Sequence, residues 1–166
     1  MPKANNANSN PLDSWALDRE IVLSRVVAVP RDLVFKVWTD PQHLPKWFGP
    51  EGFSVETQEI AIRVGGLWRF VLIGPDGARW NSRMVFLKIE VPRLLEMDHG
   101  SDKDDDPQRF RTVVTFDEQG NGKTVVTMRL LLPTTAQRET SIGFGAVELG
   151  YQTLEKMARH VGSMKG

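Results

Sequence analysis

The sequence predicts an α+β helix-grip fold, in which a curved antiparallel sheet of seven strands wraps around a long C-terminal helix. A long series of β-type segments, separated by short turn sequences, occupies the middle of the chain. One apolar strand and two short helical segments precede this series, and one long amphipathic helical segment follows it. A sheet of this size has an apolar face that must be covered, and only the last helix is long enough to cover it.

The composition indicates a soluble globular protein with one core. The chain has 166 residues, of which 40% are hydrophobic and 25% are charged, as in ordinary single domains. Its 21 basic and 21 acidic residues balance, whereas a nucleic-acid-binding protein usually carries a basic excess. Nucleic acid is therefore not an expected partner. The chain contains no cysteine, which excludes disulfides, thiol nucleophiles and thiolate metal sites.

The N-terminal segment is expected to be a disordered leader. Residues 1–14 are rich in Asn, Pro and Ser and lack the apolar run of a secretory signal peptide. No later stretch reaches the length of a transmembrane segment. We therefore expect a cytoplasmic protein without membrane insertion, whose single helix-grip domain spans residues 15–166.

The first ordered elements are expected to be one strand and two short helices. Residues 20–29 are mostly β-branched or apolar and end at Pro30, as in a partly buried strand. Apolar residues then recur at helical spacing between residues 31 and 38. Pro41 suits the first position of a second helix, which must end before the turn sequence Gly49-Pro50-Glu51-Gly52.

Six further strands are expected between residues 53 and 132. Their connections are short and rich in Gly, Pro and Asn, which favours hairpins and an antiparallel order. The predicted strands are Phe53–Ile60, Leu67–Ile73, Arg79–Glu90, Leu94–Asp98, Arg109–Phe116 and Lys123–Leu132. The acidic run over residues 101–107 is expected to be a solvated loop, because it lacks the ligand spacing of a calcium loop.

The last element is expected to be one long helix after Pro133. Apolar residues recur there at steps of three and four, which places them on one face. This stripe consists of Val147, Tyr151, Leu154, Met157, Ala158 and Val161. Gly143, Gly145 and Gly150 weaken the first turns, each by about 1 kcal/mol relative to Ala. Glycines at that cost indicate that another group needs the space.

Strand alternation sorts the side chains of the sheet into two faces. Charged residues such as Arg69, Arg83 and Arg129 mark the outer face. The inner face then includes Leu72, Ser82, Leu95, Met97, Phe110, Thr112, Val114, Phe116, Val126 and Leu130. Its many aromatic and Met side chains form either an ordinary packed core or the wall of a ligand cavity. The candidate cavity lining is Trp47, Phe48, Trp68, Phe70, Trp80, Met84, Phe86, Met128, Phe144 and Tyr151.

The polar residues show no catalytic or metal-binding motif. The histidines, His43, His99 and His160, lack metal-ligand spacing. The sequence has no Gly-x-Ser-x-Gly elbow and no phosphate-binding glycine loop. We therefore assign no catalytic residue, no metal site and no cofactor. Arg25, inside the first strand, is expected to form a structural pair with Glu56 or Glu59.

Several motifs resemble those of one family. Residues 25–30, the Val-Phe-Lys-Val-Trp-Thr-Asp-Pro sequence at 34–41 and the Lys-Trp-Phe-Gly-Pro sequence at 46–50 resemble its opening signature. This family is the bacterial branch related to the activator of Hsp90 ATPase, within the START/Bet v-like (SRPBCC) superfamily. Val29 stands where Ala is usual, and Phe48 replaces a second Trp. The resemblance extends through Gly65-Gly66, Gly74-Pro75-Asp76-Gly77 and Pro92-Arg93-Leu94-Leu95-Glu96 to Glu148-Leu149-Gly150-Tyr151 and Leu154.

The resemblance implies the helix-grip fold and a pocket. Relatives in this superfamily bind lipids, hormones or polyketides, and some are cyclases, dehydratases or resistance proteins, so fold alone implies no reaction. The leading hypothesis is a non-enzymatic protein that holds a small apolar molecule, aromatic, lipid-like or polyketide-like, in an internal cavity. The alternatives are a protein–protein module of the Hsp90-cochaperone type and a cyclase- or hydrolase-like enzyme.

The sequence also bears on two possible protein partners, a chaperone and a second copy of the chain. The namesake's additional N-terminal domain is not found in this chain, so a chaperone is not the expected partner. A symmetric homodimer is compatible with a chain of this size, although the sequence identifies no surface for it.

Overall fold

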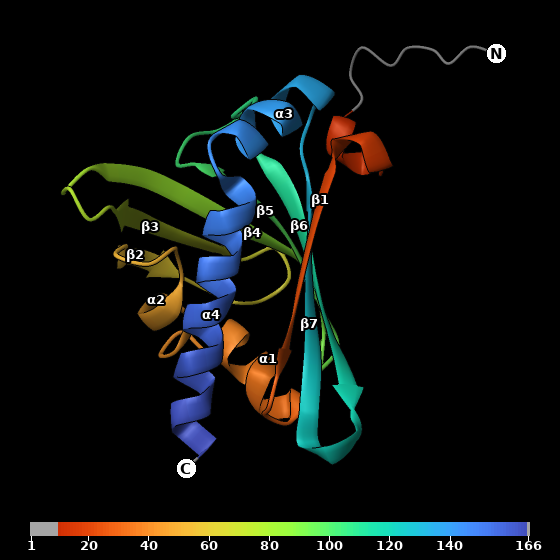
Figure 1. The fold of residues 1–166 in the computed structure, drawn as a ribbon. Helices are drawn as coiled ribbons and strands as arrows, with labels where there is room; N and C mark the ends of the chain where they lie inside the picture. The colour runs from red at the N-terminus through yellow and green to blue at the C-terminus, as the bar shows by residue number, and fades with distance from the viewer. Residues whose placement is uncertain (1–9, 166) are drawn as a thin grey trace.

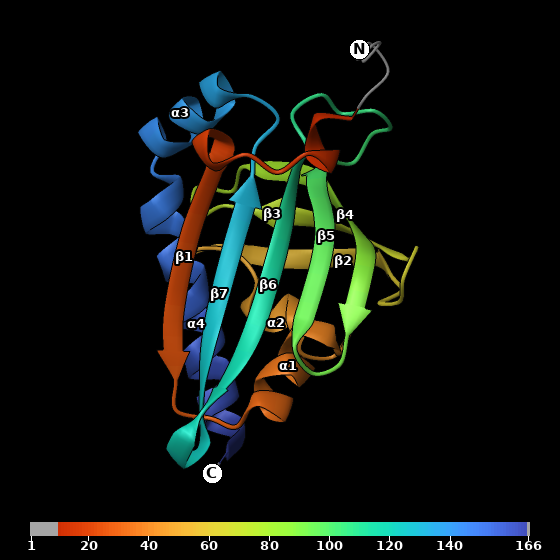
Figure 2. The same ribbon diagram turned by 90° about the vertical axis from the view of Figure 1, so that its right-hand side faces the viewer.

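The seven strands form one antiparallel sheet in the computed structural model, which describes residues 10–165 (Figures 1 and 2). The strands are β1 (Glu20–Val27), β2 (Ser54–Ile60), β3 (Leu67–Ile73), β4 (Arg79–Glu90), β5 (Leu94–Ser101), β6 (Phe110–Gln119) and β7 (Lys123–Leu131). Their spatial order is β1-β7-β6-β5-β4-β3-β2, so strands β2 to β7 form a meander and β1 joins its far edge. The predicted helix-grip fold is confirmed.

Strand β5 extends three residues beyond the predicted end at Asp98. Its additional residues pair with β4, where His99 lies opposite Met84 and Ser101 lies opposite Ser82. His99 also lies opposite Phe110 of β6. The extension matters because it continues the inward-facing series of β5 by one more side chain, that of His99.

Two short helices close one end of the sheet, as predicted. They are α1 (Arg31–Thr39) and α2 (Leu44–Trp47). Trp38 of α1 and Trp47 of α2 pack edge to face, with ring centroids 4.7 Å apart. The indole Nε1 of Trp47 donates a hydrogen bond to the Val37 carbonyl at 3.0 Å. This bond satisfies the polar atom of a fully buried ring and fixes α2 against α1.

The C-terminal region contains two helices rather than the single predicted helix. Helix α3 (Thr135–Gly143) begins at Thr134, whose hydroxyl accepts a hydrogen bond from the Gln137 N–H at 3.0 Å. Helix α4 (Ala146–Lys165) then crosses the concave face of the sheet (Figure 1). The chain breaks between them because Gly145 has φ +93°, a conformation that favours glycine.

The buried face of α4 is rotated relative to the predicted stripe. Leu154, Met157 and Val161 are fully buried, as predicted, but Tyr151 is 43% exposed. Gly150 faces β1 instead, and a Cβ atom built there would overlap the Leu23 Cδ1. Gly150 is therefore the glycine whose missing side chain allows another group to approach.

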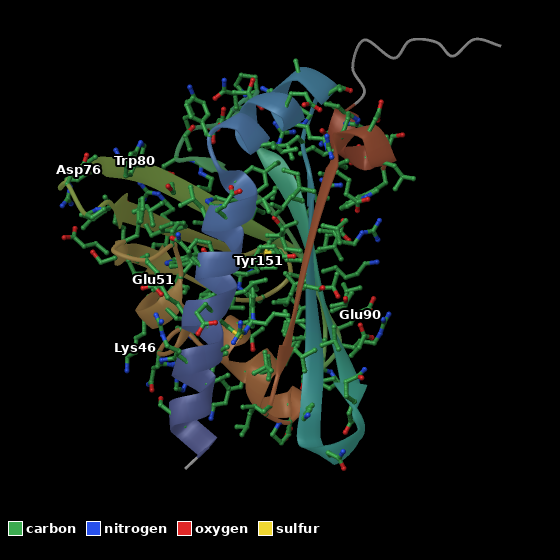
Figure 3. All side chains as sticks on the ribbon, in the orientation of Figure 1. Lys46, Glu51, Asp76, Trp80, Glu90 and Tyr151 are labelled. Atoms are coloured by element: carbon green, nitrogen blue, oxygen red, sulfur yellow. The ribbon has the colours of Figure 1, made fainter. Side chains whose placement is uncertain are left out.

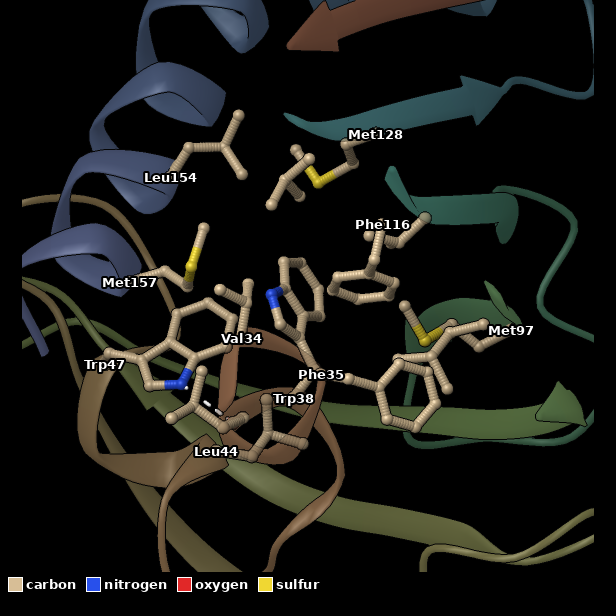
Figure 4. Packing of buried hydrophobic residues seen from close by; sticks show 14 of the residues in the cluster. Val34, Phe35, Trp38, Leu44, Trp47, Met97, Phe116, Met128, Leu154 and Met157 are labelled. Atoms are coloured by element: carbon tan, nitrogen blue, oxygen red, sulfur yellow. Dashed lines mark hydrogen bonds between the residues drawn. The ribbon is translucent and has the colours of Figure 1, made fainter. Parts of the chain in front are cut away.

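The core lies between α4 and the sheet and is rich in aromatic rings (Figure 4). Trp38 lies between Trp47 and Phe116, and its ring centroid is 6.0 Å from that of Phe116. The inward residues predicted from alternation on β5, β6 and β7 are buried or partly buried. Alternation therefore identified the concave face of the sheet correctly.

Part of the expected leader is folded. Residues Pro11–Asp13 form a 3-10 helix, η2, and Leu12 is buried. The Arg111 side chain donates to the Leu12 carbonyl at 2.8 Å, which attaches this segment to β6. A second 3-10 turn, η3 (Leu17–Arg19), leads into β1. The expected boundary at residue 14 is thus corrected, and residues 1–9 lie outside the described residues.

The acidic loop after β5 is an ion-paired structure rather than a freely solvated one. Asp102 accepts hydrogen bonds from Arg69 and Arg83 on the outer face of the sheet, at 2.7–3.1 Å. The Asp106 carboxylate accepts from the backbone N–H groups of Ser101 and Gln108 at 2.8 and 2.9 Å. These carboxylates are occupied by protein donors, which explains the acidic run without a cation.

Arg25 pairs with Glu155 of α4 at 2.7 Å, so the predicted pairing with Glu56 or Glu59 is wrong. The reason is topological, because β1 and β2 lie at opposite edges of the sheet. Glu56 and Glu59 of β2 instead meet Arg79 of β4 and Arg69 of β3, at 2.8 and 3.5 Å.

Candidate functional site

A cavity of about 130 Å³ lies between the sheet and α4. Strands β4 to β7, helices α1 and α4 and the residue that follows α2 contribute its wall. The lining side chains are Trp38, Phe48, Met84, Met97, His99, Phe110, Thr112, Met128, Leu130 and Thr153. Aromatic rings and three flexible Met side chains dominate this list, which gives an apolar and adaptable wall.

The volume of the cavity suits one small ring. A buried apolar cavity of about 150 Å³ in a well-studied engineered protein holds one benzene molecule. The present cavity, at about 130 Å³, is of the same order. Rotation of Met84, Met97 or Met128, each of which has three rotatable bonds, would adjust the space to a particular ligand.

His99 is the ionisable side chain among the described residues of the lining. Its ring lies among Phe48, Phe70 and Phe110, with centroid distances of 5.9, 5.9 and 5.0 Å. Burial in these apolar surroundings lowers the pKa of His99 to about 4, because it disfavours the charged imidazolium. The imidazole is therefore uncharged at neutral pH.

Two threonines provide the remaining polar atoms of the wall. The Thr153 hydroxyl donates to the Leu149 carbonyl of α4 at 3.1 Å, so its hydrogen atom is already used. The Thr112 side chain is buried on β6 and makes no hydrogen bond within residues 10–165. The cavity is thus apolar with a few polar atoms, which is the usual composition of a small-molecule site.

The structure places three of the ten candidate residues in the lining, namely Phe48, Met84 and Met128. Four others are fully buried but pack outside it, and these are Trp47, Trp68, Phe70 and Phe86. Trp68 and Phe70 illustrate why, since their rings stack on each other with centroids 4.0 Å apart. Their surfaces are used in core packing.

The other three candidates lie at the surface. Trp80 is 48% exposed, Phe144 is 81% exposed and Tyr151 is 43% exposed. Trp80 has the same strand parity as the buried Ser82 and Met84, but it lies near Asp76 at the end of the β3–β4 hairpin, away from α4 (Figure 3). It stacks there on Phe53 at 5.9 Å. Phe144 falls at the break between α3 and α4.

Seven lining residues were not among the candidates: Trp38, Met97, His99, Phe110, Thr112, Leu130 and Thr153. The sequence contained a signal for most of them. Met97, Phe110, Thr112 and Leu130 lie on the predicted inner face of the sheet. His99 lies on the same inward face of β5 as Leu95 and Met97, but the predicted strand ended one residue before it, at Asp98.

A second cavity, of about 120 Å³, lies beside the first near the α3–α4 junction. Its lining includes Ile21, Leu132, Ser141 and Ala146, and it shares Phe110 and Leu130 with the first cavity. A larger hollow of about 380 Å³ lies between β1 and the C-terminal part of α4. It is a more open surface groove flanked by Arg25 and Arg159.

The other two histidines meet outside the cavity. His43 Nδ1 and His160 Nε2 are 3.0 Å apart and form a hydrogen bond between the start of α2 and α4. Burial, followed by the nearby His43 and Lys46, lowers the pKa of His160. No group of three or more metal-ligating side chains occurs among residues 10–165. The pair therefore has a structural explanation as a contact between two helices.

Sequence comparison decides the family. The family model described as "Activator of Hsp90 ATPase homolog 1-like protein" matches residues 28–162. The chain belongs to this family. The match covers α1 to the last turns of α4, so this AHSA1-like region includes every element that lines the cavity.

Solved structures share the AHSA1-like fold. A Nitrosomonas europaea protein has a TM-score of 0.80 and 22% identity, over 91% of this chain and 99% of its own. An Arthrobacter aurescens protein has a TM-score of 0.80 and 21% identity, over 88% and 87% of the two chains. The AHSA1 protein from Silicibacter pomeroyi has a TM-score of 0.66 and 24% identity, over 87% and 99%.

These likenesses establish the fold. No curated protein matches the AHSA1-like sequence at a significant level. Within the described part of the chain, no helix combines the length and apolarity that crossing a membrane requires.

Proposed function

We propose that this AHSA1-like protein binds a small, largely apolar molecule in the cavity between the sheet and α4. The observation that supports the proposal is the cavity itself, an apolar space of about 130 Å³ between the sheet and α4. Transfer of apolar ligand surface into it would provide roughly 25 cal/mol per Å². The proposed ligand class is aromatic, lipid-like or polyketide-like, and the proposed location is the cytoplasm.

The composition of the lining favours binding over catalysis. Acid–base catalysis commonly uses a pair of ionisable groups with different pKa values. Among the described lining residues His99 is the one such group, and Thr153 already donates to the Leu149 carbonyl. The enzyme hypothesis therefore has less support than the binding hypothesis.

The surface gives little support to a protein–protein module. Such a module is expected to expose a contiguous apolar patch. The most exposed large apolar side chains lie in four different segments of the chain, Leu17 in η3 and Val64, Val91 and Phe144 in three connections between elements. A small molecule is therefore the proposed partner in preference to a chaperone.

The proposal is tested by filling the cavity. Toluene is titrated into the wild-type protein and into Thr153→Met, whose longer side chain would occupy the space beside Met128. Thr153→Val is the matched control, because it removes the hydroxyl without adding length. We expect wild type and Thr153→Val to bind toluene, and Thr153→Met to bind it at least tenfold more weakly. Failure of the folded wild-type protein to bind toluene, phenol or any larger neutral probe would overturn the proposal.

A further inference from the structure

We propose that the ligand is an uncharged molecule whose hydroxyl or carbonyl group is held by His99 and Thr112. This inference rests on the proposed function, since it describes the chemistry of a ligand in the same cavity. It adds a polar contact to a site that the sequence indicated only as apolar, and it requires the ligand to be uncharged.

His99 brings a polar group without a partner into the cavity. Neither ring nitrogen has a hydrogen-bond partner within residues 10–165. Trp38 Nε1, by contrast, is a fully buried nitrogen without a hydrogen-bond partner. The His99 nitrogens are not fully enclosed by protein atoms in this way. A neutral imidazole has one N–H donor and one nitrogen acceptor. It can therefore either donate to or accept from a ligand.

Thr112 lies close enough to act on the same group. His99 is opposite Phe110 and Met97 is opposite Thr112 in the β5–β6 pairing, so His99 and Thr112 are diagonal neighbours on the inner face. Diagonal neighbours in an antiparallel pair are about 7–8 Å apart, within reach of longer side chains. One ligand oxygen between them could form hydrogen bonds to both side chains, since each bond spans about 3 Å.

The lining also defines the charge of the ligand. It contains no Asp, Glu, Lys or Arg among the described residues, so a charged ligand would lose its hydration without gaining an ionic partner. His99 does not supply a positive charge at neutral pH, because burial lowers its pKa to about 4. A wholly apolar ligand would instead leave the imidazole and the Thr112 hydroxyl without water and without a hydrogen-bond partner. A neutral ligand with one polar group avoids both costs.

Four probes of similar size separate these cases. Toluene is apolar, phenol is neutral with one hydroxyl, benzoate is an anion and benzylamine is a cation. Each is titrated at pH 7 into wild type, His99→Phe and Thr112→Val, and binding is followed by calorimetry or by NMR shifts. Met97→Leu is the matched control, because Met97 lines the same cavity from the same strand without polar contacts to a ligand.

We expect phenol to bind the wild-type protein and benzoate and benzylamine to bind at least tenfold more weakly. In His99→Phe the affinity for phenol relative to toluene should fall about tenfold, the worth of one hydrogen bond to a buried group. Thr112→Val should lower the same ratio by a smaller factor. Met97→Leu should leave the ratio unchanged. The ratio cancels general changes in cavity shape.

The outcomes distinguish this inference from the function on which it rests. If toluene binds but the ratio is the same in wild type, His99→Phe and Thr112→Val, the protein has an apolar pocket and the polar contact is refuted. Benzoate or benzylamine binding as tightly as phenol would refute the neutral ligand. If no probe binds, the proposed function itself fails. Should His99→Phe not fold, Thr112→Val decides, because valine has nearly the shape of threonine.

Discussion

Gly150 determines how closely α4 approaches the sheet. Any larger residue there would place its Cβ against the Leu23 side chain of β1. The helix loses intrinsic stability at this position, because glycine is about 1 kcal/mol less favourable than alanine inside a helix. The close contact between α4 and β1 offsets that loss by burying Leu23 and Leu154 completely.

Gly150→Ala should destabilise the protein by about 2 kcal/mol, since either Leu23 or the helix must move in a packed core. Gly162→Ala is the control in the same helix, because a Cβ at Gly162 meets no atom within 4 Å. It should raise stability by about 0.5–1 kcal/mol. Urea denaturation of the two variants measures both values. Equal stability of the two variants would show that α4 can shift away from β1 without cost.

Asp102 holds two arginines on the outer face of the sheet. Its side chain is only 9% exposed, and hydrogen bonds from Arg69, followed by those from Arg83, lower the pKa of its carboxyl group. Asp102→Asn should cost about 2 kcal/mol at pH 7, because both guanidinium groups lose a charged acceptor. Asp104→Asn, at a residue whose side chain is 89% exposed, should cost less than about 0.5 kcal/mol.

The effect of Asp102→Asn on stability should also depend on pH. A carboxyl group with a lowered folded-state pKa stabilises the protein above its unfolded-state pKa, and this stabilisation disappears as the pH falls through the folded value. The difference between wild type and Asp102→Asn should therefore shrink in acid. A difference that stays constant down to the acid transition would mean that the lost contacts are not ionic.

At the scale of elements, α3 is less firmly anchored to the core than α4. None of its nine residues is buried, whereas Leu154, Met157 and Val161 attach α4 to the core. Local opening should therefore require much less free energy in α3 than in α4. Hydrogen exchange is expected to be at least tenfold faster for the amides of residues 139–143 than for those of residues 154–161. Equal protection would show that α3 and α4 open together.

The elements were predictable where patterns are strong. β3 and β4 have the predicted ends because Gly-rich turns and the Val91-Pro92 sequence delimit them and period-two alternation runs through much of them. The end of β5 was missed because Gly100 and the acidic run imitate a loop, whereas ion pairs to Arg69 and Arg83 hold this region on the sheet. The break between α3 and α4 was missed because α3 has no buried residue and therefore no apolar stripe of its own. The apolar periodicity that predicted a helix belongs to α4, after Gly145.

At the scale of the molecule, the cavity was harder to predict than the fold. Alternation identifies which strand side chains face inward, and Met84 and Met128, which it placed on the inner face, line the cavity. It does not tell which inward side chain touches empty space and which touches another ring. Trp68 and Phe70 stack on each other, while the smaller Thr112 borders the cavity. That distinction depends on distances between elements, which one sequence does not contain.

His99 should shape the pH dependence of stability of the whole protein. Its folded-state pKa is about 4, below the unfolded value of about 6.5. Between these values the unfolded chain binds the proton and the folded protein does not, so stability falls as the pH falls. The loss should approach about 3 kcal/mol between pH 6.5 and pH 4. His99→Phe should remove this slope, and a slope unchanged in that variant would show that His99 is hydrated.

The pairing of β1 with β7 has a consequence for synthesis of the protein. Glu20 lies opposite Leu131 and Val27 lies opposite Thr124, so the first strand to leave the ribosome pairs with the last. Strands β2 to β6 can form hairpins as they emerge, but β1 has to wait until β7 has been made. During this wait its apolar residues Ile21 and Leu23 lack the α4 surface that later buries them. The interval before β7 and α4 emerge is therefore the period in which a nascent-chain chaperone would be most useful to this protein.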